Sequence, residues 1–399
     1  MKFLPKLMAA ALALGPLSVR GDGDVFVLAT NWTLAASGVE RLAYAPTSGL
    51  LLSPDRSRRE IHLHRVDWKT AAVSVVDAFP PTDAMTGIPT PGAPVAVAAH
   101  PTAPLALALS RPPDVRTRGE VLFLDLRERT AGRLLRSQLI GFQPAAVAIS
   151  ADGRWAVVLN KGDGNRRTPG SIGILDLQNL SGWENDRLAE APYRELGGLD
   201  TLLGTPLGRL EPGALALDPE GRIGVVTFKE NDAAVFIDFR GDIPALAGAI
   251  RLSRGSRPAG VALLPQPDGT LLMALAEKAA QHVSFHRIAL NDAAPAPLLL
   301  SRVDVRPLVH GGRPGRQRDP ETIVLRRMDA RSVAWVASEY SDRVVMLDVT
   351  DARAPVLLGR AAAAKEPADL LAVERPDGWA ILAANRDGTA SLLRAPADR

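Results

Sequence analysis

Residues 144–177 read PAAVAISADGRWAVVLNKGDGNRRTPGSIGILDL. The segment opens with a proline and an aliphatic and alanine run, and it turns at Asp152-Gly153 into a second run rich in β-forming residues. A polar loop then leads to a third apolar run that ends in Asp176-Leu177. Since glycine accepts a positive φ without a steric penalty, Asp-Gly is typical of a tight hairpin turn. The segment therefore predicts three consecutive antiparallel strands.

The same pattern recurs along most of the chain. Its copies begin PVAVA at Pro94, PAAVA at Pro144, PGALA at Pro212, PAGVA at Pro258, PETIV at Pro320 and PADLL at Pro367. A weaker seventh copy, VERLA at Val39, keeps the aliphatic residue and the alanine but lacks the proline. Seven units of about 45 to 68 residues, each made of short strands, are typical of a β-propeller.

A fourth strand is expected in the linker of each unit, as in LLRSQLI at 134–140. The apolar runs are short, rich in Val, Ile and Leu, and bounded by turn residues, which argues against a helical solenoid. We therefore expect an all-β fold, a seven-bladed β-propeller of four-stranded antiparallel blades, with residues 22–399 as a single domain. The segment VFVLATNW at 25–32 is expected to pair with residues 389–394, so that an N-terminal strand closes the last blade and removes two free edges.

The N-terminus has the features of an export signal. Lys2 and Lys6 supply a positive start, and residues 7–17 supply an apolar stretch that is too short to span a bilayer. We expect a signal peptide at 1–21 and a periplasmic or secreted protein without a transmembrane segment. A buried first helix and a retained interfacial anchor are the alternatives.

Composition limits the chemistry of the chain. The 399 residues include no cysteine, which excludes disulfides, thiolate zinc sites and cysteine nucleophiles. The formal net charge is +3, and removal of Lys2, Lys6 and Arg20 with the signal would bring it to zero. We therefore expect no nucleic-acid partner.

The repeats resemble those of lactonase-like or surface-layer-type β-propellers, and in particular the choice-of-anchor I domain, also called mesenchyme-specific cell surface glycoprotein-like. The matching segments are GVERLAYAPTSGLLL at 38–52, the segment at 144–177, LEPGALALDPEGRIGVVTFKENDAAVFIDF at 210–239, and DPETIVL at 319–325 with ASEYSDRVVMLDV at 337–349. The resemblance implies an exported propeller. Family copies often carry Glu after the repeat proline and an Asn-Glu pair after the second strand, whereas this chain has Gly213 after Pro212 and Lys161 after Asn160.

In a propeller, the linker into each first strand and the loop after each second strand emerge on one face around the central channel. The residues expected to bind a ligand there are Glu40, Asn160, Lys161, Glu230, Asn231, Glu321, Glu339 and Asn385. Carboxylate and amide oxygens are ligands that calcium prefers, so a Ca²⁺ ion at Glu40, Glu230, Asn231 and Glu321 is one hypothesis. The alternative is that these polar residues end strands and turns and are simply solvated.

Basic residues fall on the same loops. They are Arg111, Arg116, Arg118, Lys161, Arg166, Arg167, Arg313, Arg316 and Arg318. Guanidinium groups suit carboxylates and phosphates, so the face is expected to meet a small acidic ligand or an acidic protein partner. Charge that only keeps long loops soluble is the alternative. Two insertions, at 178–211 and 291–319, are candidates for a lid that uses Trp183 or Tyr193, or for simple packing.

The motifs of common enzymes are missing, because the chain has no GxSxG, HExxH, P-loop or GxGxxG helix opening. The histidine pairs, His62 with His64 and His282 with His286, fit core or strand-surface positions better than metal ligation. The leading hypothesis is a binding or interaction module. The alternatives are a cation-assisted hydrolase of lactones or phosphoesters and a structural envelope protein.

Overall fold

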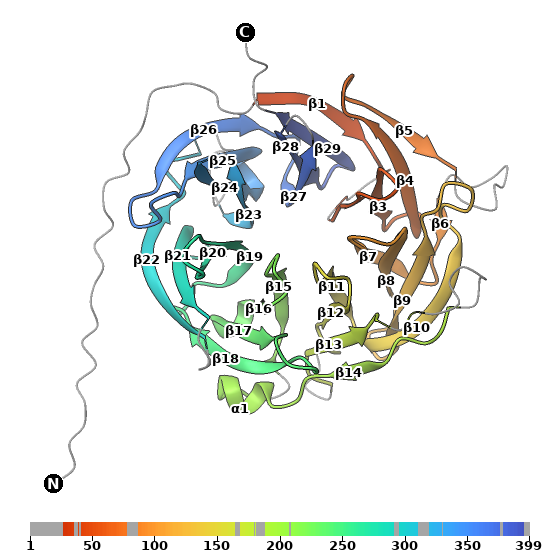
Figure 1. Cartoon of the computed structure of the whole chain (residues 1–399), viewed down its shortest axis with the longest axis horizontal. Helices are drawn as coiled ribbons and strands as arrows, with labels where there is room; N and C mark the ends of the chain where they lie inside the picture. Colours follow the sequence, from red (N-terminus) through yellow and green to blue (C-terminus); the bar gives the residue numbers. More distant parts are fainter. Residues whose placement is uncertain are drawn as a thin grey trace.

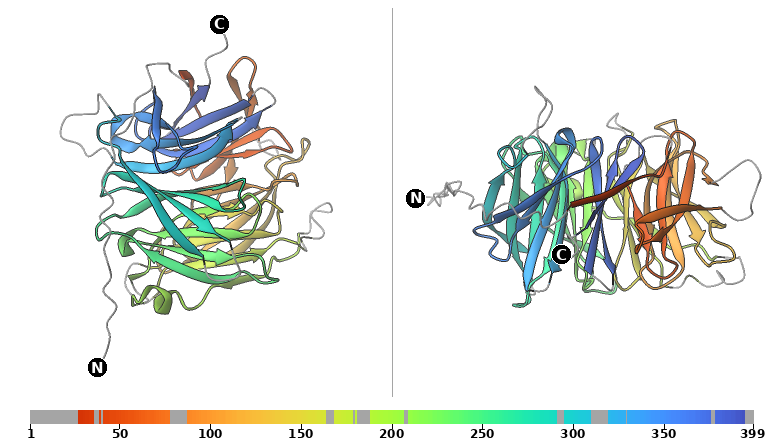
Figure 2. Two further views of the ribbon diagram at one scale, coloured as in Figure 1. Left: turned by 60° about the vertical axis from the view of Figure 1, so that its left-hand side comes forward. Right: turned by 90° about the horizontal axis from the view of Figure 1, so that it is seen from above.

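A computed structural model describes residues 27–35, 39, 41–77, 87–163, 168–178, 180, 188–206, 209–290, 295–309, 319–328, 330–375 and 378–394. Its strands form seven sheets arranged radially around a central channel (Figure 1), and the ring has the shape of a thick disc (Figure 2). The predicted seven-bladed β-propeller of four-stranded antiparallel blades is confirmed.

Blades 1 to 6 take their strands in chain order from the channel to the rim, and in blade 7 the N-terminal β1 (Val27–Thr33) follows β29 (Thr389–Arg394) at the rim (Figure 1). Blade 1 contains β2 (Ala43–Ala45), β3 (Leu50–Asp55), β4 (Glu60–Asp67) and β5 (Ala72–Val76), with β6 (Ile88–Pro89) beside β4. Blade 2 contains β7 (Ala93–Ala99), β8 (Leu105–Arg111), β9 (Arg118–Asp125) and β10 (Leu134–Phe142). Blade 3 contains β11 (Pro144–Ile149), β12 (Trp155–Asn160), β13 (Ser171–Asp176) and β14 (Tyr193–Glu195).

The remaining blades follow the same plan. Blade 4 contains β15 (Pro212–Leu217), β16 (Ile223–Phe228), β17 (Ala233–Asp238) and β18 (Ala245–Arg251). Blade 5 contains β19 (Pro258–Pro265), β20 (Leu271–Glu277), β21 (His282–Ala289) and β22 (Ala296–Asp304). Blade 6 contains β23 (Pro320–Met328), β24 (Arg331–Ser338), β25 (Arg343–Asp348) and β26 (Val356–Ala362). Blade 7 contains β27 (Pro367–Arg375), β28 (Gly378–Asn385), β29 (Thr389–Arg394) and β1 (Val27–Thr33).

The second strand of a blade is buried on both faces, because a neighbouring blade covers each side. Every residue of β12 and β16 is buried. Between blades 3 and 4, Trp155 and Phe228 belong to one continuous apolar cluster with Leu203 of the short helix α1 (Leu199–Leu203). Burial on both faces explains why these strands are continuous apolar runs in the sequence and not alternating ones.

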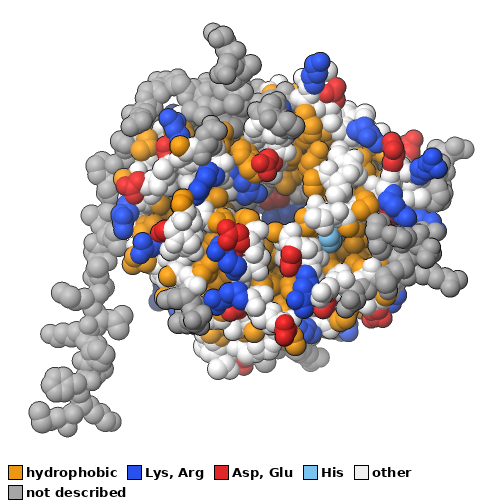
Figure 3. Space-filling view, viewed as in Figure 1, with side chains coloured by type: hydrophobic (Ala, Val, Ile, Leu, Met, Phe, Trp, Pro, Cys, Tyr) orange, Lys and Arg blue, Asp and Glu red, His pale blue; other side chains and the backbone are white. Residues whose placement is uncertain are grey.

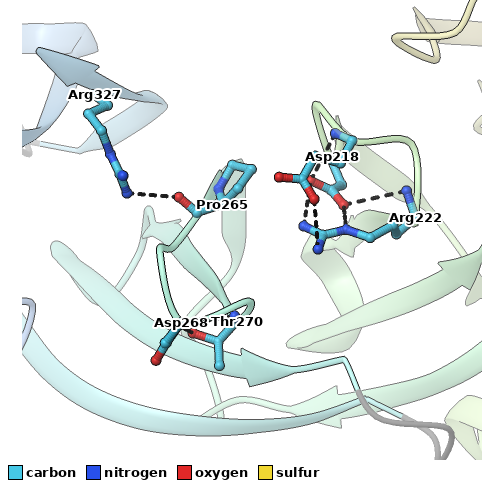
Figure 4. Close-up of polar contacts among 7 residues, drawn as sticks. Asp218, Arg222, Pro265, Asp268, Thr270 and Arg327 are labelled. Atoms are coloured by element: carbon cyan, nitrogen blue, oxygen red, sulfur yellow. Dashed lines mark hydrogen bonds and ion pairs between the residues drawn. The ribbon is translucent and has the colours of Figure 1, made fainter.

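The turns between first and second strands are held by aspartates. The Asp218 carboxylate accepts a hydrogen bond from Arg222 Nε at 2.6 Å, and Asp268 accepts bonds from the backbone N–H and hydroxyl of Thr270 at 3.0 and 2.6 Å (Figure 4). Such side-chain acceptors satisfy turn N–H groups that no strand reaches. The turns therefore end the strands at defined residues.

Neighbouring blades are also joined by polar contacts at these turns. Arg327 Nη2 of blade 6 donates to the carbonyl of Pro265 in blade 5 at 3.0 Å (Figure 4), and Arg154 Nη2 of blade 3 donates to that of Asp242 in blade 4 at 3.0 Å. These bonds complement the apolar packing between the sheets.

The two predicted insertions mainly supply outer strands. The first contains β14 and α1, and the second contains β22. Tyr193 lies in β14, where its hydroxyl accepts a bond from Asn160 Nδ2 and donates to Glu195 Oε1, each at 3.1 Å. Tyr193 therefore packs within blade 3 and does not form a lid, while Trp183 lies outside the described residues.

The predicted closing strand is confirmed. β1 pairs antiparallel with β29, and Asn31 stands opposite Ser391. The Ser391 hydroxyl donates to Asn31 Oδ1 at 2.7 Å and accepts bonds from Asn385 Nδ2 at 3.0 Å and the Ala364 N–H at 2.9 Å. One buried hydroxyl thus ties the N-terminal strand to the C-terminal blade. Among the described residues, none of the helices has the length and apolar character needed to cross a bilayer.

We expect Ser391→Ala to destabilise the ring, because the buried Asn385 amide, the half-buried Ala364 N–H and the exposed Asn31 amide would lose their shared partner. The expected loss is about 2–3 kcal/mol of unfolding free energy, measured as a lower urea midpoint. Ser253→Ala, at an exposed serine before β19, is the matched control and should change little. Equal midpoints for the two variants would show that the closure does not depend on this hydroxyl.

Candidate functional site

The repeat proline marks an irregularity in the strand ladder. In the six blades that carry it, the register between first and second strands shifts directly after the proline. Such a bulge leaves the next residue unpaired and re-aims its side chain. The residues in that position line one cavity at the channel end, and they are Val95, Ala145, Gly213, Ala259, Glu321 and Ala368.

A second set of residues surrounds the same cavity. The last buried residue of the second strand stands opposite the repeat proline, and the residue after it is basic in all blades except blade 6. These basic residues are Arg56, Arg111, Lys161, Lys229, Lys278 and Arg386. Blade 6 has Glu339 in this position. We call the cavity of about 370 Å³ enclosed by these basic residues and the bulged residues the channel mouth.

Backbone hydrogen bonds fix the residues after the second strands in place, whatever side chains they carry. In blades 3, 5, 6 and 7 the N–H of this residue donates to the carbonyl of a residue just before the repeat proline. The bonds run from Lys161 to Gln143 at 3.0 Å, from Lys278 to Arg257 at 3.2 Å, from Glu339 to Asp319 at 3.1 Å and from Arg386 to Glu366 at 3.3 Å. Small bulged residues therefore leave space into which long basic side chains extend.

Charge at the channel mouth is divided unequally. Lys278 Nζ lies 2.5 Å from Glu321 Oε2 and 2.5 Å from Glu339 Oε2, and Arg386 Nη2 lies 2.7 Å from Glu339 Oε1. Burial acts to raise the pKa of Glu321, but the charge and hydrogen bond of Lys278 outweigh it and hold that pKa below its usual value. The side formed by blades 5, 6 and 7 is therefore neutralised within the protein.

The other side keeps positive charge. Lys229 is half-buried and makes no ion pair with any described residue. Burial, together with the nearby charge of Lys278, lowers its pKa. Arg111, which also lines the mouth, donates from Nε and Nη2 to the Pro144 carbonyl at 3.0 and 2.8 Å, and these bonds orient its guanidinium. This side offers cations to an acidic group.

The channel continues below the mouth as a cavity of about 270 Å³ between the first strands of blades 4 to 7. Arg41 and Glu321 line both cavities, and Arg41 Nη1 lies 3.1 Å from Asp369 Oδ1. Burial raises the pKa of Asp369 although Arg41 opposes the shift. Figure 3 shows the hollow at the centre of the ring, with Lys and Arg side chains at its floor.

The predicted binding residues separate into groups. Lys161 and Glu321 line the channel mouth, and Glu339 lies behind it against Lys278. Asn160 and Asn385 are fully buried in their blades, with Nδ2 bonded to other strands of the same sheet. Neither lines the channel mouth or the cavity below it.

Glu230 and Asn231 lie beside the mouth. They line a cavity of about 480 Å³ between the loops of blades 3 and 4, which we call the side pocket. The Glu230 carboxylate forms an ion pair with Arg257, a linker residue of blade 5. Glu40, the remaining predicted residue, lies outside the described residues.

Of the predicted calcium ligands that the structure describes, Glu230 and Asn231 line one cavity and Glu321 lines another. No group of three or more His, Asp or Glu residues in the described ranges is placed to hold a metal ion. Glu230 and Glu321 instead lie against Arg257 and Lys278. Of the paired histidines, His62, His64 and His286 are buried and His282 is partly exposed, and burial lowers the pKa of His64 and of His286 to about 4.

Some of the basic residues predicted on the loops lie at the channel mouth, and others do not. Arg111 and Lys161 reach the channel mouth, whereas Arg118 Nε donates to the Ile140 carbonyl at 2.6 Å and Arg116 is exposed. The predicted residues outside the described ranges are Arg166, Arg167, Arg313, Arg316 and Arg318. Four further basic residues at the mouth belong to no sequence motif and were not predicted: Arg56, Lys229, Lys278 and Arg386. An alignment of the repeats on the residue opposite the repeat proline would have found them.

We expect Lys278→Met to destabilise the protein by about 3–5 kcal/mol at neutral pH, because it leaves buried carboxylates without their cation. In the wild type the lowered pKa of Glu321 contributes stability that is present at neutral pH and is lost as the pH falls through that pKa. In the variant, burial would raise the pKa of Glu321, so the deficit should narrow as the pH falls. The measurement is the denaturation midpoint of the wild type and of the variant at several pH values from 7 to 4.

The matched control is Lys69→Met, at an exposed lysine of the β4–β5 turn. A deficit of Lys278→Met that is the same at all pH values would contradict a role based on charge.

Comparisons with solved structures agree with the fold. A periplasmic gluconolactonase from Pseudomonas aeruginosa is 14% identical, with a TM-score of 0.58 over 90% of this chain and 88% of that one. A hydrazine synthase from Kuenenia stuttgartiensis is 14% identical, with a TM-score of 0.57 over 98% and 100%. A protein from Lactobacillus plantarum is 13% identical, with a TM-score of 0.59 over 88% and 87%. At these identities the likeness is one of fold.

Family membership comes from the sequence. No curated protein sequence matches the chain significantly. The family model of the choice-of-anchor I domain matches residues 40–244, which include blades 1 to 3, the first three strands of blade 4 and the prolines at 94, 144 and 212. Because this match spans just over half of the 399 residues, the protein belongs to the choice-of-anchor I domain family.

Proposed function

We propose that this protein is an exported binding module that holds a small acidic ligand at the channel mouth. The observation that carries the proposal is the recurrence of Lys or Arg at one structural position in six blades, all around one cavity. Repeats that turn equivalent cations toward a common point create a local excess of positive potential. That potential favours an anion.

The cavity suits a small molecule. Its volume of about 370 Å³ lies within the range of small-ligand pockets. Guanidinium and ammonium groups form short, charge-assisted hydrogen bonds with carboxylates and phosphates. Because the cations converge on an enclosed mouth and do not spread over an outer surface, the geometry favours a small acid over nucleic acid.

The charge distribution suggests how a ligand would be oriented. Lys278 and Arg386 already meet Glu321 and Glu339, so they neutralise charge within the protein. We therefore place the acidic group of the ligand on the side of blades 2 to 4, against Arg111, Lys161 and Lys229, of which Lys161 also meets Glu211 at 3.3 Å. Lys229 is central to the proposal because it makes no ion pair with another described residue.

Export is supported by the N-terminal sequence and by the family. We propose that residues 1–21 are removed as a signal peptide and that residues 22–399 act as a single domain in the periplasm or outside the cell. A cell-surface or exported location is also typical of choice-of-anchor proteins.

The two alternative functions, a hydrolase and a structural protein, predict different experimental results. A cation-assisted hydrolase of lactones or phosphoesters needs carboxylates that are open to a metal ion such as Ca²⁺, whereas Glu321 is paired with Lys278. It predicts turnover that a chelator abolishes and that Glu321→Gln and Glu230→Gln reduce. A structural envelope protein predicts no ligand and no effect of changes on this face. The binding proposal predicts saturable binding without chelator-sensitive turnover.

We expect Lys229→Gln to weaken anion binding about tenfold, because it removes one charge-assisted hydrogen bond. The measurement is calorimetric titration of the purified protein with inorganic phosphate, tripolyphosphate and sugar acids, after a thermal-shift screen of the same panel that also includes calcium. Affinity should also fall as salt is added.

The control is Lys69→Gln, which removes an equal charge from the exposed β4–β5 turn at a residue that does not line the mouth. The proposal fails if no anion in the panel binds the wild type, or if Lys229→Gln and Lys69→Gln bind it equally well.

A further inference from the structure

The side pocket adjoins the channel mouth. It lies between the loops of blades 3 and 4, and its volume of about 480 Å³ exceeds the 370 Å³ of the mouth. Lys161 lines both cavities, so one ammonium group stands at their boundary. A ligand bound at the mouth can therefore extend past Lys161 into the side pocket.

The acidic residues of the side pocket are already paired. Lys161 Nζ lies 3.3 Å from Glu211 Oε1, and Glu230 forms an ion pair with Arg257. The Asp232 carboxylate accepts the backbone N–H groups of Gly255 and Arg257 at 2.7 and 2.8 Å. Their negative charge is therefore largely satisfied by protein groups.

Two guanidinium groups in the side pocket are not balanced in this way. Arg209 is exposed, and its side chain makes no hydrogen bond or ion pair with another described residue. Arg251 is also exposed, and its side chain makes one long hydrogen bond of 3.3 Å to the Asn231 carbonyl and no ion pair within the described ranges. The pocket consequently carries two cations available to a ligand.

The rest of the wall mixes polar residues with Pro169 and Leu210 and has no aromatic side chain among its described residues. Thr168 and Thr205 supply hydroxyl groups, and Gly170 packs directly against the Leu210 backbone, where a Cβ would lie 2.2 Å from the carbonyl oxygen. A wall without aromatic rings offers nothing on which a base or an aromatic ligand could stack. It fits a flexible, hydrophilic chain.

We propose that the side pocket is a second anion subsite, and that the ligand is an extended, non-aromatic small molecule with at least two acidic groups. One acidic group lies at the channel mouth near Lys229, and another lies against Arg209 and Arg251. The inference rests on the proposed function, because it assumes that an anion binds at the mouth.

Inorganic phosphate and linear polyphosphates of increasing length are the probes, since they share one chemistry and differ in reach. Longer chains should bind the wild type more tightly than orthophosphate. Arg209→Gln and Arg251→Gln together should weaken the long chains about tenfold or more and leave orthophosphate unchanged. Lys229→Gln should weaken both.

Arg254→Gln is the matched control, because Arg254 is exposed on the turn after β18 but does not line the side pocket. The subsite is refuted if Arg251→Gln binds long chains as Arg254→Gln does, or if chain length has no effect on affinity. Orthophosphate binding that still depends on Lys229 would then leave the mouth site standing. If no phosphate binds the wild type, both proposals fail.

Discussion

The register of the first two strands is the constraint on which the site depends. In six blades the repeat proline faces the last buried residue of the second strand, and the ladder shifts directly after it. The shift turns a small residue toward the channel, and the residue that follows the second strand reaches the same cavity. One local backbone feature, repeated around a closed ring, therefore builds a cavity with a basic wall.

The second determinant is electrostatic. Lys278 is held by Glu321 and Glu339, which belong to the neighbouring blade, and Arg386 completes the group from blade 7. This cluster joins three blades at the channel and neutralises one side of it. The positive potential of the remaining cations at the mouth is opposed by few carboxylates. The loops that carry these cations also form the side pocket, so the mouth and pocket share one surface.

The fold could be predicted from sequence because its evidence is local and repeated: apolar runs recur in all seven repeats, the proline in six of them, and a turn glycine in most. The site was predicted in part. Lys161 was recognised, yet Asn160 beside it proved to be a buried blade residue. The pairing of Lys278 with Glu321 joins residues 43 positions apart, and no motif encodes it. The basic wall was missed because single motifs were considered, whereas the signal lies in one register position compared across blades.

The central claim is that the channel mouth is an anion site, and anomalous diffraction from crystals soaked in selenate tests it most directly. Selenate has the shape and charge of a small dianion, and its selenium can be located without bias from the protein atoms. The account predicts a strong anomalous peak inside the mouth, within hydrogen-bond reach of Lys229 and Arg111. Peaks confined to the outer surface of the ring, with none in the mouth, would contradict it.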